Sequence, residues 1–478
     1  MIRRETLIRF EEKIVVQRSI QDCFDYLIDL INLQDWNPAV IGVKQISKGP
    51  PSLNWEYEVN LQLGFYQMPI RLRLQHIEDK KEIVIHGEHE LFAIEDTLFF
   101  THEGDMTGIR YQSEFQLKGM WEYATPLFKP MITQLNRKSI ERLEKALGQA
   151  PDYQPATTLE KIADRLVIPG LAKFTRFGYQ FEHRDWIPHA GFLKNKNAII
   201  TDGTSGIGVA VASAFARLGA RVLIIGPDET KGILVQNQIR EETGKEVIFE
   251  KANFSQVDEV INMAARVYQH FEKVDVLVNL SGEINFKRKV SDEGIEKTVA
   301  TSLLGPFIFT ETIHDLLNKS QDARIINVAS GMIYAQKINL NDIESKEKPY
   351  QGNLAFARAK RALVDLTEIW ADKWQEDHIS VHSVHPGWAD TSDFRTSMPG
   401  LYRLVKPLLR SPEQGADTIV WLASSPSQQI DSGQFWLDRR PHPTALITGS
   451  QSSTKEKKRL YEVLLSYWEK MTEKRTGT

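Results

Sequence analysis

Six short apolar runs, each followed by a helical stretch, dominate the chain from Asn195 onward. Each run is continuously hydrophobic, as strands buried on both faces of a sheet are. Strands of this kind joined by helices predict an α/β domain with a parallel, doubly wound sheet over residues 195–445. The runs are NAIIT (197–201), RVLII (221–225), EVIFE (246–250), VDVLVN (274–279), ARIINV (323–328) and ISVHSV (379–384), and GQFWLD (433–438) is expected as a seventh strand.

Residues 1–150 have a different pattern, in which apolar and polar residues alternate over several short segments. This alternation is typical of an antiparallel sheet with one buried face. Helical spacing at 19–36 and again at 126–148 predicts helices at the two ends of this region. The expected strands are 13–16, NWEYEVNLQL (54–63), MPIRLRLQHI (68–77), EIVIHG (82–87), DTLFFTHE (96–103) and GIRYQSEFQL (108–117).

This order of elements, with Trp36-Asn37-Pro38 after the first helices, resembles the START-like superfamily, also called SRPBCC or polyketide cyclase-like. The resemblance implies an α+β helix-grip domain, in which an antiparallel sheet wraps a long helix and leaves a cavity for a small apolar or lipid-like ligand. The aromatic residues of the region could contact such a ligand or simply pack in the core, and core packing is favoured. They are Trp36, Trp55, Phe65, Phe99 and Phe100.

Residues 151–194 are interpreted as a helical connector, and residues 446–478 as a helical tail. The connector opens with Pro151 and Pro155 and contains an apolar, aromatic run at 166–181 with two basic residues, Lys173 and Arg176. That run suits peripheral contact with a membrane surface or, as the favoured alternative, a helix packed on the next domain. The basic start of the tail helix (455–470) is expected to be a solvated face.

Composition excludes several classes of protein. The 478 residues carry 59 Lys plus Arg and 63 Asp plus Glu, a net charge of −4, which does not favour a nucleic-acid partner. Cys23 is the only cysteine, so an internal disulfide and a thiolate metal cluster are excluded. No apolar run approaches the roughly 20 residues needed to span a bilayer, and the N-terminus lacks a signal-peptide pattern, so the expected location is cytoplasmic.

Histidine pairs at two places suggest metal binding only superficially, and no metal site is predicted. His86 and His89 lie three apart on a predicted strand and would face opposite sides of the sheet. His382 and His385 lie at the end of another strand, where packing or loop hydrogen bonds explain them.

The first strand of the α/β region leads directly into the glycine loop and helix TDGTSGIGVAVASAFARLGA (201–220). Backbone N–H groups at the start of such a helix can bind a pyrophosphate, and glycines let the phosphate approach the backbone. Gly206-Ile207-Gly208 fits this role, which predicts a dinucleotide site.

From this loop onward the chain resembles the short-chain dehydrogenase/reductase superfamily, and more narrowly its dehydrogenase/reductase family member 12-like branch. The resemblance covers roughly residues 160–470 and includes the connector aromatics Phe174, Phe177 and Tyr179, HPGWADT (385–391) and RSPEQGADTIVWLA (410–423). It implies a Rossmann-type fold, NAD or NADP as the cofactor, and a chemistry of carbonyls and alcohols. It also allows a homo-oligomer, because the family often associates through its long helices.

The resemblance assigns a set of cofactor-binding residues, with one departure in the first loop. Asp202 stands where the family has its first glycine, with Gly203 next, so either the loop shifts by one residue or a carboxylate lies close to the pyrophosphate and weakens its binding. Pro227, where the branch tends to carry arginine, weakens the case for NADP, and Asp228 is a possible ribose partner. The assigned residues are Thr201, Thr204, Ser205, Gly206, Ile207, Gly208, Asn253, Asn279, Gly282, Lys360, Pro386, Gly387 and Thr391.

The catalytic group departs further from the family. Ser330 matches the serine that orients the substrate carbonyl, and Lys360 matches the lysine that binds ribose and lowers the pKa of a tyrosine. That tyrosine, four residues before the lysine on the same helix face, is replaced by Phe356. The family's asparagine position is occupied by Ser302. Tyr334 and Tyr350 are the nearby hydroxyls that could substitute.

Two main functional hypotheses follow. The first is an NAD(P)-dependent oxidoreductase acting on an apolar or lipid-like carbonyl or alcohol, with Ser330 and Lys360 as catalytic residues and a first domain that binds a hydrophobic ligand. The second is a non-catalytic dinucleotide- or lipid-binding protein that has lost proton transfer, because phenylalanine has no ionisable group. A purely structural fusion is a third, less specific alternative.

Overall fold

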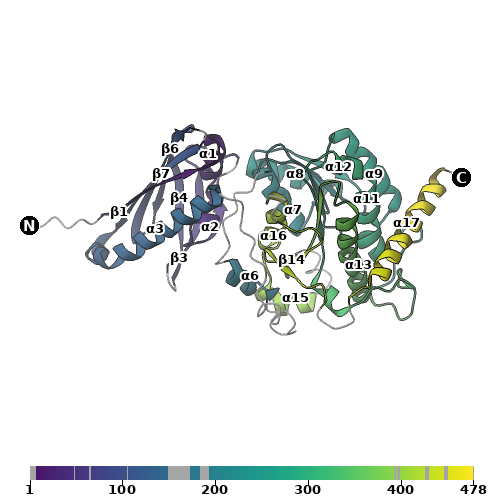
Figure 1. Cartoon of the computed structure of the whole chain (residues 1–478). Helices are drawn as coiled ribbons and strands as arrows, with labels where there is room; N and C mark the ends of the chain where they lie inside the picture. Colours follow the sequence, from purple (N-terminus) through teal and green to yellow (C-terminus); the bar gives the residue numbers. More distant parts are fainter. Residues whose placement is uncertain are drawn as a thin grey trace, which may run out of the picture. The chain divides into compact units, whose positions relative to one another are not determined.

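The structure is a computed structural model in which the chain forms two compact units (Figure 1). The first unit is described over residues 7–47, 49–63, 66–104 and 106–148. The second is described over residues 173–183, 193–391, 395, 399–425, 430–445 and 451–476. Within these ranges, none of the helices combines the length and the apolar character needed to cross a bilayer.

The first unit is a seven-stranded antiparallel sheet with the order β1-β7-β6-β5-β4-β3-β2. The predicted strands are present, β1 begins earlier than expected, and β2 is a strand in addition to those predicted. The bounds are β1 Leu7–Val16, β2 Val40–Gln45, β3 Glu56–Leu63, β4 Tyr66–Glu78, β5 Glu82–Glu88, β6 Phe92–Glu103 and β7 Met106–Leu117.

One long helix, α3 (Thr125–Gly148), covers the buried face of this sheet (Figure 1). Its side chains Ile140, Leu143 and Leu147 are buried with the inward residues of the strands. The predicted helix at 19–36 is interrupted at Asp29, whose backbone is extended and whose carboxylate accepts a hydrogen bond from the N–H of Ile31. The resulting pieces are α1 Ile20–Ile28, η1 Leu30–Asn32 and α2 Leu33–Trp36.

The aromatic residues of the first unit differ in whether their side chains lie in the core. Trp36, Trp55 and Phe100 are buried in the core, as expected. Phe99 points to the other side of β6, where the guanidinium of Arg110 lies 4.2 Å from its ring centroid, so the core assignment of Phe99 is wrong. The alternation of a strand explains this, since neighbouring residues face opposite sides. Phe65 lies outside the described residues.

The second unit is an eight-stranded sheet with the order β10-β9-β8-β11-β12-β13-β14-β15. All pairs are parallel except β14 with β15, a short final strand that the sequence analysis did not predict. The order reverses between β8 and β11, the point at which doubly wound sheets bind ligands. The bounds are β8 Asn197–Thr201, β9 Arg221–Gly226, β10 Val247–Lys251, β11 Val276–Asn279, β12 Ala323–Val328, β13 Ile379–Val384, β14 Phe435–Leu437 and β15 Arg440–His442.

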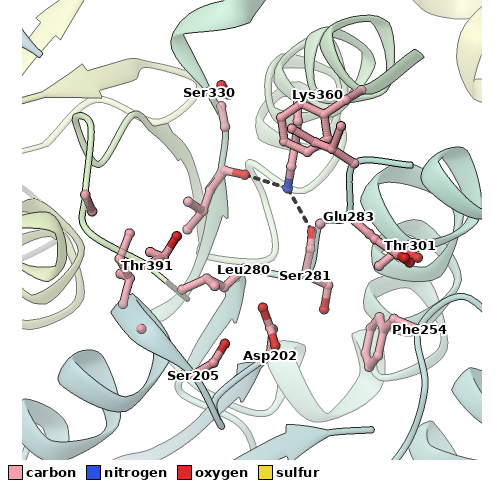
Figure 2. A pocket seen from close by; sticks show the side chains of 18 of the residues that line it. Asp202, Ser205, Phe254, Leu280, Ser281, Glu283, Thr301, Ser330, Lys360 and Thr391 are labelled. Atoms are coloured by element: carbon pink, nitrogen blue, oxygen red, sulfur yellow. Dashed lines mark hydrogen bonds between the residues drawn. The ribbon is translucent and has the colours of Figure 1, made fainter. Parts of the chain in front are cut away.

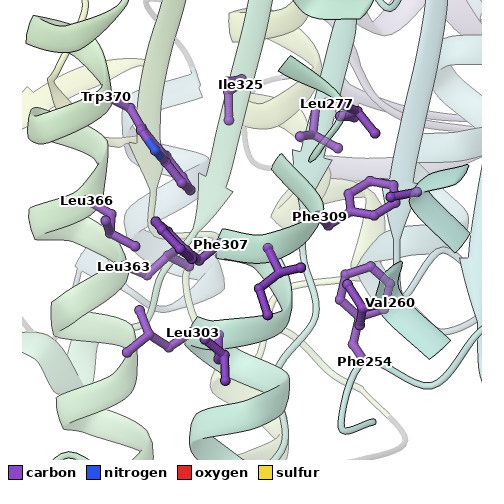
Figure 3. Close-up of a cluster of buried hydrophobic side chains, with 14 of the residues drawn as sticks. Phe254, Val260, Leu277, Leu303, Phe307, Phe309, Ile325, Leu363, Leu366 and Trp370 are labelled. Carbon is purple, nitrogen blue, oxygen red and sulfur yellow. The ribbon is translucent and has the colours of Figure 1, made fainter. Parts of the chain in front are cut away.

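Helices cover both faces of this sheet. Helices α9, α11, α13 and α17 pack on one face, where the rings of Phe307 and Trp370 stack 6.1 Å apart (Figure 3). Helices α7, α8 and α16 pack on the other. The bounds are α6 Arg176–His183, α7 Gly206–Arg217, α8 Glu229–Thr243, α9 Val257–His270, α10 Lys297–Val299, η3 Ala300–Leu304, α11 Gly305–Thr312, α12 His314–Asn318, η4 Gly331–Ala335, α13 Gly352–Lys373, α15 Pro399–Val405, η5 Lys406–Leu408, α16 Pro412–Ser424 and α17 Thr454–Thr476.

Residues 173–183, part of the expected connector, pack within the second unit. The buried guanidinium of Arg410 forms a two-pronged ion pair with Asp438, at 2.6 and 2.8 Å, and also donates to the backbone carbonyls of Lys173 and Thr175. A buried pair of this kind is costly to break, because either partner alone would be an uncompensated charge. For this stretch the favoured interpretation, a helix packed on the next domain, is confirmed. The rest of the expected connector, 151–172 and 184–192, lies outside the described residues.

Candidate functional site

A cavity of about 870 Å³ opens in the second unit at the carboxyl ends of the central strands (Figure 2). The residues after β8, β11 and β12 form its walls, together with the start of α13 and the loop after β13. This is the edge at which an open parallel sheet binds its ligand. The predicted site residues that line the cavity are Ser205, Gly206, Ile207, Asn253, Gly282, Ser330, Lys360, Gly387 and Thr391.

The glycine loop after β8 keeps the register that the resemblance implies. Asp202 has φ 54°, the left-handed conformation that favours glycine, so it takes the backbone role of the family's first glycine without a shift of one residue. A Cβ on Gly208 would lie 2.2 Å from the carbonyl oxygen of Asp202, which shows how closely α7 approaches this loop. The carboxylate of Asp202 lines the cavity (Figure 2).

Besides Gly208, four residues assigned to cofactor binding do not line the cavity. Two of them, Thr201 and Asn279, make hydrogen bonds that support the cavity walls. The hydroxyl of Thr201 accepts hydrogen bonds from the N–H groups of Leu280 and Ser281, which fixes the loop after β11. The amide nitrogen of Asn279 donates to Thr310 and Asn327, joining β11 to its neighbours beneath the site. Thr204 and Pro386 are the other two.

At the far end of the cavity, Asn253 and Phe254 follow β10, and Gly226 and Pro227 end β9. The side-chain oxygen of Asn253 accepts a hydrogen bond from the N–H of Ser255, so it holds its own turn. The carboxylate of Asp228 accepts from the N–H of Lys231 and caps α8, and it does not line the cavity.

Lys360 is held at the wall of the cavity by two backbone carbonyls. Its Nζ donates to the carbonyl oxygen of Ser281 at 2.8 Å and to that of Val328 at 2.9 Å (Figure 2). The side chain is buried, and burial lowers the pKa of its ammonium from 10.5 to about 7, while the carboxylate of Asp202 acts in the opposite direction. Neither carbonyl acceptor could be found from motif matching, because backbone oxygens carry no sequence signal.

Phe356 lies one helical turn before Lys360 on α13 and lines the same cavity. The Nζ of Lys360 is 6.0 Å from the centroid of its ring. Asn353, one turn further toward the start of α13, also lines the cavity, and the helical spacing of 353, 356 and 360 could have identified it.

Ser330 lines the cavity at the end of β12. Its hydroxyl oxygen accepts from the N–H of Met332 at 3.3 Å, which leaves its own O–H as a donor. Ser302 is fully buried in the π-helical turn η3 and accepts from the N–H of Glu283 at 3.3 Å, so it supports the cavity wall from behind.

Neither candidate replacement for the missing phenol lines the cavity. The hydroxyl of Tyr350 donates to the carboxylate of Glu296 at 3.0 Å, and the pKa of Tyr350 is raised to about 12, chiefly by burial. Tyr334 stacks against Phe174 in a buried aromatic cluster. Among the lining residues that the structure describes, the ionisable groups are therefore Asp202, Glu283 and Lys360.

The loop after β13 forms the remaining wall and is fixed from outside the cavity. The N–H of Trp388 donates to the carbonyl of Phe174 at 2.7 Å, and a Cβ on Gly387 would collide with the guanidinium of Arg410. His385 is buried and its Nδ1 accepts from the N–H of Gly387, which confirms the loop hydrogen bond expected there. Burial lowers the pKa of His382 and of His385 to about 3, so both are neutral.

Comparison with known proteins agrees with this arrangement. Residues 196–399 match the family described as short chain dehydrogenase, and residues 8–148 match the family described as polyketide cyclase / dehydrase and lipid transport. Dehydrogenase/reductase SDR family member 12 of Homo sapiens is 36% identical over 300 residues, which are 62% of this chain and 94% of that protein. The Bos taurus protein of the same name is 34% identical over 299 residues, with the same shares.

More distant similarities include a curated relative and a solved structure. Retinol dehydrogenase 11 of Homo sapiens is 28% identical over 249 residues, 52% of this chain and 78% of its own. A solved short-chain type dehydrogenase/reductase from Mycobacterium marinum is 22% identical with a TM-score of 0.44, covering 52% of this chain and 95% of its own. Because the member 12 relatives are 34–36% identical and are matched over 94% of their length, the chain belongs to the short-chain dehydrogenase/reductase family, and its residues 8–148 match the polyketide cyclase / dehydrase and lipid transport family.

Proposed function

We propose that the second unit is an NAD-linked oxidoreductase for an apolar or lipid-like carbonyl or alcohol, and that the first unit binds an apolar ligand. The observation that carries this proposal is one cavity lined by the start of α7, by Ser330 and by the anchored amine of Lys360. The start of α7 can bind an anion, Ser330 can donate a hydrogen bond to a carbonyl oxygen, and the Lys360 cation can bind sugar hydroxyls. All three groups line the same cavity.

The lining residues fit a dinucleotide. The N-terminus of α7 at Gly206 offers backbone N–H groups, and a Cβ on that glycine would lie 3.0 Å from Thr391, so the cradle exists only because the side chain is absent. By the resemblance, Asn253 would contact the adenine, while Lys360 and Thr391 would contact the nicotinamide side. When bound, the dinucleotide would supply or accept the hydride.

The charges around the cavity favour NAD over NADP. A 2′-phosphate needs a cation beside the end of β9, usually arginine. Among the described lining residues, Pro227 holds that place, and the one cation is Lys360, at the other end of the cavity. NADP would thus bring two further negative charges to a wall without a positive partner.

The substrate side of the cavity is mostly apolar. Met332, Trp388, Ala389 and Val405 line it together with the ring of Phe356. Apolar walls of this kind favour a substrate with a hydrocarbon body, and Ser330 offers the polar contact that would orient its carbonyl oxygen.

In the first unit, a buried polar cluster lies on the inner side of β6 and β7. Asp96 on β6 is buried and hydrogen-bonded to Tyr111 and Ser113 on β7, and burial raises its pKa to about 6. A carboxyl in such surroundings would give an apolar ligand one polar anchor. This cluster supports a ligand that combines a hydrocarbon body with a hydroxyl or carbonyl group.

A second candidate function is a non-catalytic dinucleotide- or lipid-binding protein. The observation in its favour is Phe356, which has no proton to give, together with the absence of a phenol among the described lining residues. Under this alternative the cavity binds its ligand and catalyses no reduction.

Titration with NADH and NADPH, followed by cofactor fluorescence, tests dinucleotide binding. NADH should bind the full chain, and more tightly than NADPH. Gly206→Ala should weaken NADH at least about tenfold, because its φ of 45° and the contact with Thr391 oppose a side chain. Gly294→Ala is the matched control, since Gly294 also has a positive φ but has open space around it. If neither NADH nor NADPH binds, the proposed function is removed.

Phe356→Tyr separates the oxidoreductase from the non-catalytic alternative. We expect the unmodified chain to oxidise NADH slowly with an apolar aldehyde, and Phe356→Tyr to be faster, because it adds a phenol as a further proton donor beside Lys360. Tyr350→Phe, which removes a phenol outside the cavity, should change nothing. No turnover by the unmodified chain, with turnover appearing only in Phe356→Tyr, would establish the alternative instead.

Extraction of the purified full chain into organic solvent tests the ligand of the first unit. Mass spectrometry should find an apolar molecule carrying a hydroxyl or carbonyl, and Asp96→Ala should lower its occupancy, while Glu95→Ala on the opposite side of β6 should not. An empty extract, with no binding of an added apolar fluorescent probe, would contradict a ligand-binding role for this unit.

A further inference from the structure

Lys360 donates two hydrogen bonds to backbone carbonyls, which leaves a third ammonium proton for another acceptor. Its side chain is 3% exposed, and its Nζ donates to the carbonyl oxygens of Ser281 and Val328. An ammonium group carries three N–H donors, and two carbonyls occupy two of them. The third remains for whatever enters the cavity.

Gly282 lets the end of this side chain lie close to the backbone at the cavity wall. A Cβ built on Gly282 would lie 2.9 Å from Cε and 3.1 Å from Nζ of Lys360, and 3.4 Å from Cε2 of Phe356, so a side chain there would press against the lysine. Gly282, Phe356 and Lys360 all line the cavity. An oxygen atom that enters the cavity within hydrogen-bond distance of Nζ could accept the third proton of Lys360.

No other described group around the cavity is better suited to give this proton. Phe356 has none, and the phenols of Tyr334 and Tyr350 lie outside the cavity. The hydroxyl of Ser330 is a poor acid by itself at neutral pH. Glu283 is exposed rather than enclosed.

We propose that Lys360 is itself the general acid and base of the reaction, in place of the phenol that Phe356 lacks. The inference rests on the proposed function, which supplies the hydride. In the reducing direction the carbonyl carbon gains a hydride from the reduced nicotinamide, and its oxygen gains a proton from the Lys360 ammonium. The products are an alcohol, the oxidised dinucleotide and a neutral amine, which regains its proton from water. Oxidation runs through the same steps in reverse.

The electrostatic surroundings give this step a defined pH dependence. Burial lowers the pKa of Lys360 to about 7, and the Asp202 carboxylate raises it; Glu283 is the other charged residue of the lining. Lys360 is therefore mostly an ammonium below pH 7 and mostly a neutral amine above it. Because reduction consumes the ammonium, its rate should fall as the pH rises through about 7, and oxidation should gain over the same range.

Two measurements test the proposal, and the first does not depend on activity. Brief labelling with acetic anhydride across a pH series, read by peptide mass spectrometry, reports the fraction of each lysine that is neutral. Lys360 should be half-reactive near pH 7. Lys373, on the same helix outside the cavity, is the reference amine, and its labelling should be the same in the unmodified chain and in Asp202→Asn. Asp202→Asn should move the midpoint of Lys360 to lower pH, because it removes the carboxylate that favours the charged form.

The second measurement is the rate of reduction of an apolar aldehyde by NADH over the same pH series. The rate should fall above the midpoint found by labelling, and Asp202→Asn should shift both together. Lys360→Arg keeps a cation that does not give up its proton near neutral pH. It should therefore bind NADH within a few-fold of the unmodified chain and reduce about 10²-fold more slowly. Lys373→Arg is the control and should leave the rate and its pH dependence unchanged.

The outcomes separate the proposed function from the role of Lys360 as proton donor. Absence of NADH binding removes the proposed function and this inference with it. If NADH binds, any of three results overturns Lys360 as the proton donor and leaves dinucleotide binding standing. These results are no turnover, a pH dependence of the rate that Asp202→Asn does not shift, or full activity in Lys360→Arg. If Lys360→Arg does not fold, as judged by its thermal transition, the Asp202→Asn series decides.

Discussion

The arrangement of the second unit depends on the two hydrogen bonds from Lys360 to the carbonyls of Ser281 and Val328. These oxygens follow β11 and end β12, so one side chain joins α13 to two central strands at the point where the sheet meets the cavity. Because the bonds replace water around a buried amine, they keep the amine in place while leaving its charge only weakly stabilised. The two hydrogen bonds and the burial of Lys360 therefore both hold α13 against the sheet and determine the reactivity of the amine.

Phe356 changes the chemical role that Lys360 can have. With a phenol beside it, the cation would mainly lower the pKa of that phenol and bind sugar hydroxyls. With a phenyl ring beside it, the lysine lies next to an apolar surface, and the Asp202 carboxylate on the glycine loop is the group that opposes the loss of its charge. Asp202 would disfavour a pyrophosphate but favour a charged Lys360, so two departures from the family affect one another across the same cavity.

Much of the architecture could be predicted because it depends on side-chain periodicity. Continuous apolar runs located the parallel strands, and the alternation at 54–117 located the antiparallel ones. The break at Asp29 and the short strand β15 were missed, because one depends on a local side-chain bond and the other on pairing with β14. In the site, motif matching found Lys360 and Ser330. It could not show that Asn279 supports the sheet from below, since that depends on contacts with Thr310 and Asn327.

Calorimetric titration of NADH into the full chain at pH 8, in buffers of different ionisation enthalpy, measures whether the Lys360 amine changes its protonation when the dinucleotide binds. An anionic ligand beside Lys360 should raise the pKa of its amine, which at this pH is mostly neutral, so binding should take up a fraction of a proton. The measured heat should depend on the buffer in the unmodified chain and not in Lys360→Arg. Binding without proton uptake, or the same uptake in the variant, would contradict it.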